Sequence, residues 1–181
     1  MTLSCKHPDR VSSLISLDTA PISFANDDSA IKQTINHLNQ IKSLDIHGKS
    51  RKGAIEVVEK EFTDKGIANF ITTNLVYDEA TNNKTVKWGV NFDAIINNFH
   101  HIKGFNDDGS LNPYQGPSLF INGSFTTQKM QEEGAFPKDD LVSLFKPMFP
   151  DCTAVILEGA GHFIHTDKPQ QVCSLIKDFL I

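Results

Sequence analysis

Three short runs of apolar residues, each bounded by turn residues, occur in the chain, one near its start and two after residue 116. They are VSSLISLD (11–18), PSLFING (117–123) and TAVILEG (153–159). None of them alternates strictly between apolar and polar positions, as a strand with one solvated face would. The three runs therefore predict buried strands of a parallel sheet.

Apolar residues at helical spacing follow the second and the third of these runs. Segment 139–149 places apolar residues at i, i+3, i+4 and i+7, which marks one apolar helix face; these are Leu141, Leu144, Phe145 and Met148. Segment 169–180 repeats the spacing, and Pro169 suits a first helical turn because its missing N–H would be unpaired there anyway. A strand, a helix, a strand and a helix in this order predict an α/β sheet.

The long middle of the chain has a different pattern. Helical spacing of apolar residues predicts helices over 29–44, 51–62, 65–76 and 91–102. The polar stretch EATNNKT (79–85) predicts a turn between the last two. We therefore expect a mostly helical insertion between two strands of the sheet.

Composition narrows the class of protein. A length of 181 residues, 39% of them hydrophobic, is typical of one globular domain. The net charge of -5 argues against nucleic acid as a partner, and the chain has no run of about 18 apolar residues that would predict a membrane span. The first residues, MTLSCKHPDR, lack the pattern of a secretory signal. Three scattered cysteines predict reduced, mostly buried thiols of an intracellular protein.

One histidine lies in a glycine-rich turn, EGAGHFIHTDKP (158–169), directly after the third apolar run. Gly159 and Gly161 allow a turn that projects His162 over the carboxyl edge of the sheet, where ligands bind in open α/β folds. An imidazole with a pKa near neutrality can take a proton and return it. His162 is therefore a candidate general base, and the alternative is an ordinary exposed histidine.

Four stretches in order resemble α/β-hydrolase-fold esterases. HPDRVSSLISLDTAP (7–21) is similar to the strand after the nucleophile helix, and FITTNLVYDEATNNKTVKWGVNFDAI (70–95) is similar to the lid of one branch. GPSLFING (116–123) and EGAGHFIHTDKPQQVCSLIKDFL (158–180) resemble the next strand, the histidine loop and the last helix. This branch contains bacterial short-chain acyl esterases and mitochondrial abhydrolase-domain proteins. The resemblance covers essentially the whole chain.

The resemblance implies the C-terminal part of an α/β-hydrolase fold with an inserted helical lid. Residues 1–23 would begin the hydrolase core, 24–112 would form the lid, and 113–181 would complete the core. The family's G-x-S-x-G nucleophile elbow occurs nowhere in the sequence. We expect its serine roughly ten residues before Met1, so that Met1 is an internal methionine or the gene is split.

The resemblance also assigns site residues. His162 would be the general base, and Asp18 its orienting acid, because this branch places the acid at the earlier strand end. Most α/β hydrolases instead have a G-x-x-D pattern, which here reads Gly123-Ser124-Phe125-Thr126. Thr126 would then be a hydrogen-bonding neighbour without charge. The alternative for Asp18 is a cap of the turn before Thr19. No metal and no organic cofactor are implied.

Two functions remain open at this point. The first is a serine carboxylesterase fragment that acts on a small acyl ester or lipid-like substrate in the cytoplasm or the mitochondrion. Without the elbow it would be inactive unless an N-terminal half completes it in cis or in trans. The second is a non-catalytic, hydrolase-like remnant that serves as an interaction or structural subunit.

Overall fold

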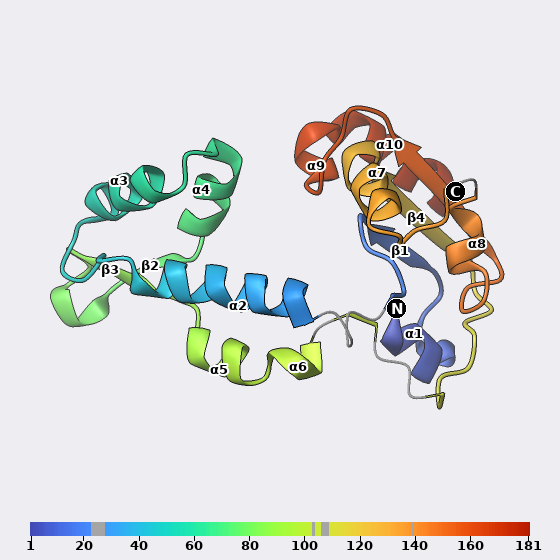
Figure 1. Cartoon of the computed structure of the whole chain (residues 1–181), viewed down its shortest axis with the longest axis horizontal. Coiled ribbons are helices and arrows are strands. Elements are labelled where there is room, and N and C mark those ends of the chain that lie inside the picture. Colours follow the sequence, from blue (N-terminus) through green and yellow to red (C-terminus); the bar gives the residue numbers. More distant parts are fainter. Residues whose placement is uncertain (23–27, 103, 106–108, 139) are drawn as a thin grey trace. The chain divides into compact units, whose positions relative to one another are not determined.

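The computed structural model describes residues 1–22, 28–102, 104–105, 109–138 and 140–181. The chain divides into two compact units, coloured along the sequence in Figure 1. The first, which we call the core unit, comprises Met1–Ala25 and Gly104–Ile181. The second, the insert unit, comprises Asn26–Lys103. The interpretation of the insert unit as a lid stays a prediction.

The core unit is built on a three-stranded sheet. Its strands are β1 (Leu14–Leu17), β4 (Ser118–Gly123) and β5 (Cys152–Leu157), and the order β1-β4-β5 places β4 in the centre. Both pairings are parallel, with Leu17 opposite Ile121 and Ile121 opposite Val155. The three strands predicted from apolar runs are therefore confirmed.

Both faces of this sheet are covered. Phe120 of β4 packs into one apolar cluster with Phe145 and Phe149, and its ring stacks on that of Phe145 at 3.9 Å. Its neighbours Leu119 and Ile121 point to the opposite face and belong to a second cluster. Successive side chains of a strand alternate between faces, so the two clusters form two separate layers of core. This arrangement confirms the α/β class, with helices on a parallel sheet.

The helices of the core unit agree with the sequence pattern only in part; they are α1 (Thr2–Lys6), η1 (Pro8–Arg10), α7 (Ser124–Glu132), α8 (Val142–Phe145), α9 (Ile164–Asp167) and α10 (Pro169–Leu180). The helix predicted over 169–180 is confirmed as α10. The helix predicted over 139–149 is much shorter as α8, and residue 139 lies outside the described residues. The Asp140 carboxylate accepts the Val142 N–H at 2.9 Å and so starts the helix late, while Pro147 has no N–H with which to continue it.

Two further features of this unit differ from the sequence analysis. Helix α7 was not predicted. It buries Thr127 and leaves Phe125 63% exposed, so its sequence shows little apolar spacing at helical period. The cysteines are free, but only Cys5 is buried; Cys152 is half-buried and Cys173 is exposed. The expectation of a mostly buried set was therefore wrong, because Cys173 directly follows Val172, the buried residue of α10, and adjacent helical residues point about 100 degrees apart.

The insert unit is mostly helical, as predicted; its elements are α2 (Asp28–Ser43), α3 (Arg51–Glu61), α4 (Lys65–Thr72), β2 (Leu75–Tyr77), η2 (Glu79–Thr81), β3 (Val86–Trp88), α5 (Phe92–Asn97) and α6 (Phe99–Ile102). The predicted helix 65–76 ends at Thr72, and the chain continues into an antiparallel hairpin of β2 and β3 that was not predicted. The predicted helix 91–102 is divided at Asn98.

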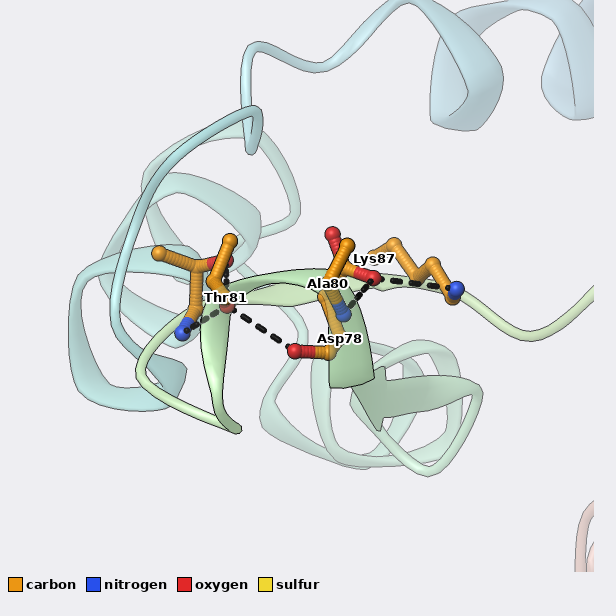
Figure 2. Close-up of polar contacts among 5 residues, drawn as sticks. Asp78, Ala80, Thr81 and Lys87 are labelled. Carbon is orange, nitrogen blue, oxygen red and sulfur yellow. Dashed lines mark hydrogen bonds and ion pairs between the residues drawn. The ribbon is translucent and has the colours of Figure 1, made fainter.

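Polar contacts close this hairpin, as Figure 2 shows. The Asp78 carboxylate accepts the Ala80 N–H at 3.3 Å and pairs with the Lys87 ammonium at 3.1 Å. The hydrogen bond from Lys87 is the largest cause that lowers the pKa of Asp78. Asn82 adopts left-handed backbone with φ of 51°, which asparagine tolerates. The polar stretch EATNNKT is therefore a hairpin connection.

Among the described residues, no helix combines the length and the apolar character that crossing a bilayer requires.

Candidate active site

Asp18 lies directly after β1, at the carboxyl edge of the sheet. Its backbone N–H donates to the Ile121 carbonyl at 2.7 Å, which extends the pairing with β4 by one residue. Its φ of 52° is left-handed, a conformation that aspartate adopts more readily than most residues. The Ser16 and Thr19 hydroxyls hydrogen-bond each other at 2.5 Å across this turn. The turn buries the Asp18 side chain completely.

His162 lies in the loop between β5 and α9, which we call the histidine loop (158–163). Hydrogen bonds to α7 and to Asp167 anchor this loop. The Ser124 hydroxyl accepts the Gly159 N–H at 3.0 Å, and the Phe125 N–H donates to the Ala160 carbonyl at 3.1 Å. The Asp167 carboxylate accepts the Gly161 N–H at 2.8 Å. Gly159 has φ of 69°, where a side chain would be strained. The loop therefore presents His162 from a defined backbone.

The structure brings His162 and Asp18 together, although 144 residues separate them in the sequence. His162 Nδ1 lies 2.8 Å from Asp18 Oδ2, and Asp18 Oδ1 accepts the Gly123 N–H at 2.7 Å. The imidazole is 63% exposed, whereas the carboxylate is fully buried. An ionised carboxylate can only accept, so Nδ1 donates to it and the neutral ring keeps its lone pair on Nε2. A reacting hydroxyl could reach that nitrogen.

The surroundings of His162 favour its protonated form. The hydrogen bond to Asp18 is the largest cause that raises the pKa of His162, and the negative charge of Asp18 adds to it. Partial burial lowers the pKa of His162 and offsets part of this effect. The imidazole is therefore a stronger base than an isolated histidine.

Thr126 is less directly related to His162 than Asp18 is. It lies in the first turn of α7 and is half-buried. Within the described ranges, no hydrogen bond joins Thr126 to His162, and the acceptor for Nδ1 comes from Asp18. Sequence reasoning missed Gly123, whose N–H supports the carboxylate, and Ser124 and Asp167, which anchor the histidine loop. The glycine of the G-x-x-D pattern was the available signal for Gly123.

Over the residues whose placement is described, no group of three or more His, Cys, Asp and Glu side chains could hold a metal ion.

The chain is similar to several esterases and lipases over almost its whole length. It is 24% identical to Esterase YbfF of Escherichia coli over 99% of this chain and 62% of that protein. It is 26% identical to the sn-1-specific diacylglycerol lipase ABHD11 of Mus musculus, over 99% of this chain and 54% of that protein. No protein-family model matches the chain.

One solved structure resembles the fold closely. It is a marine microorganism esterase, with a TM-score of 0.77 and 24% identity, over 97% of this chain and 63% of that chain. The chain thus spans only about half to just under two thirds of the length of the relatives it matches. The part of these proteins that it matches is an α/β fold with a parallel sheet.

Proposed function

We propose that the chain, which is similar to α/β-hydrolase esterases over almost its whole length, carries the base and the acid of a serine esterase. His162 is the general base, and Asp18 orients it. The single observation that supports this assignment best is the 2.8 Å contact between His162 Nδ1 and the buried Asp18 carboxylate. A cap of the turn, the alternative for Asp18, would not need the second oxygen to meet an imidazole.

In the proposed reaction, His162 Nε2 takes the proton of a serine hydroxyl while the serine oxygen attacks the ester carbonyl carbon. The resulting tetrahedral intermediate collapses, the ester C–O bond breaks, and the imidazolium returns the proton to the departing alcohol. Water repeats the same steps on the acyl-serine and releases the acid. Asp18 stabilises the imidazolium, and the Gly123 N–H keeps Asp18 oriented. Thr126 contributes at most a neutral hydrogen bond.

The nucleophile is proposed to come from polypeptide outside these 181 residues, in cis or in trans. No G-x-S-x-G elbow occurs among the 181 residues, and hydrolysis needs the nucleophile within hydrogen-bond reach of its base. The same polypeptide would supply the oxyanion hole. On this proposal the chain alone does not turn over, and the insert unit acts as the lid over a small acyl ester or lipid-like substrate. The similarity to an esterase and to a diacylglycerol lipase supports this substrate class.

Labelling with a serine-reactive fluorophosphonate tests the proposal. The in-frame sequence upstream of Met1 is read first, and the chain is then expressed with and without any G-x-S-x-G segment found there. We expect that only the longer protein is labelled and that only the longer protein hydrolyses p-nitrophenyl acetate and butyrate. His162→Ala should abolish turnover in the longer protein, while His165→Ala, three residues away and exposed, is the matched control.

Two results would contradict the proposal. Labelling of the 181-residue chain would mean that another serine is the nucleophile. Unchanged turnover of the longer protein with His162→Ala would remove the base assignment. If the upstream sequence encodes no elbow and no partner restores labelling, a non-catalytic remnant becomes the better account.

A further inference from the structure

The acid and the base come from strands that are not neighbours. Asp18 follows β1 and His162 follows β5, and β4 lies between these two strands. Neighbouring strands are about 4.8 Å apart, so the axes of β1 and β5 are separated by about 9.6 Å. The two side chains must therefore meet across the carboxyl end of β4, and the last residue of that strand is Gly123.

Gly123 contacts both partners. On one side its N–H donates to Asp18 Oδ1 at 2.7 Å, a buried hydrogen bond. On the other side its Cα lies against the histidine loop. A Cβ built on Gly123 would come within 2.6 Å of the Ala160 carbonyl oxygen and still closer to that of Gly161. These are backbone atoms, which cannot rotate away as the end of a side chain can.

Backbone conformation does not require glycine at this position. Gly123 has φ of -79° and ψ of 142°, which are extended values open to any residue. Only the lack of space for a Cβ excludes a side chain. This separates Gly123 from Gly159, which is required for its left-handed φ.

We propose that Gly123 is a positioning residue for the Asp18–His162 pair: it orients the carboxylate through its N–H and lets the histidine loop approach through its missing side chain. This inference rests on the proposed function. To relieve a 2.6 Å contact to an ordinary one of 3.4 Å, the Ala160 carbonyl must move by about 0.8 Å. Because Ala160 and His162 belong to the same loop, a shift of this kind would displace the imidazole and lengthen or misalign its 2.8 Å contact with Asp18.

An NMR titration of the His162 imidazole in the 181-residue chain tests the inference, with the resonance assigned through His162→Gln. Asp18→Asn serves as the reference and should lower the pKa of His162, since the carboxylate raises it. We expect Gly123→Ala to cause most of the same decrease. The matched control is Gly161→Ala, because a Cβ there meets only Asp167 Oδ2, at an ordinary 3.5 Å. It should leave the pKa of His162 unchanged.

The outcomes separate the two proposals. If Asp18→Asn leaves the pKa of His162 unchanged, the acid assignment itself fails. If Asp18→Asn lowers the pKa of His162 but Gly123→Ala does not, the acid assignment stands and the positioning role is overturned.

If Gly123→Ala does not fold, hydrogen exchange of the Gly123 backbone amide tests the inference instead. Its N–H should be protected in the wild type and in Asp18→Asn, which keeps an acceptor, and should lose protection in Asp18→Ala. Equal protection in all three proteins would overturn the inference.

Discussion

Removing the Asp18 carboxylate in two ways separates its roles in the folded state. Asp18→Ala deletes the acceptor of the Gly123 N–H and of His162, and it places alanine at φ of 52°. Asp18→Asn keeps an oxygen for the Gly123 N–H and keeps a residue that tolerates left-handed backbone. It removes the negative charge and replaces Oδ2, the acceptor for His162 Nδ1, with an amide NH2 group that can only donate. We therefore expect alanine to destabilise the core unit more than asparagine.

Two contributions make up the expected difference in the free energy of unfolding between the two variants. The Gly123 N–H, left buried without an acceptor in Asp18→Ala, costs about 1–3 kcal/mol. Left-handed backbone costs an alanine about 1–2 kcal/mol more. Asp18→Ala should therefore lower the free energy of unfolding by about 2–5 kcal/mol. For Asp18→Asn we expect about 1 kcal/mol or less, because the partner imidazole is 63% exposed.

Urea denaturation at about pH 8, monitored by far-UV circular dichroism, measures the free energy of unfolding of each variant. The two variants should have similar denaturant slopes and different midpoints, with asparagine close to the wild type. Equal losses of stability for alanine and asparagine would refute the reasoning. They would mean that neither the Gly123 hydrogen bond nor the left-handed turn carries the stability assigned to it.

The protonation of His162 predicts a pH dependence of stability. The pKa of His162 is raised in the folded state, so its contribution is fully present below the ordinary value of about 6.5 and is lost as the pH rises through the folded pKa. The stability advantage of the wild type over Asp18→Asn should therefore shrink as the pH rises above about 6.5, and an advantage that grows as the pH rises would contradict the assignment. In the core, Phe145→Ala should cost about 3–5 kcal/mol, because Phe145 is fully buried and stacks on Phe120. The exposed Phe125→Ala, measured in the same urea series, should stay within about 0.5 kcal/mol of the wild type, and similar losses for both would contradict the layer assignment.

Elements with a strong local signal were predictable. The apolar runs became β1, β4 and β5, and the spacing after Pro169 became α10. The hairpin of β2 and β3 was missed because each strand has three residues, too few to show a period against the helical pattern before it. Helix α7 was missed because it packs through Thr127 and Met130 and leaves Phe125 outside.

The sequence by itself determined the α/β class, the glycine turn that carries His162, and the family resemblance, since all three depend on residue types at short spacing. It left Asp18 open between an acid and a turn cap. Only the tertiary structure decided that Asp18 and not Thr126 accepts the His162 Nδ1 hydrogen bond, across 144 residues of chain. It also decided that Gly123 lies between them. These facts depend on strand order and on the close packing of one loop against one strand end, and no local pattern of residues encodes such distances.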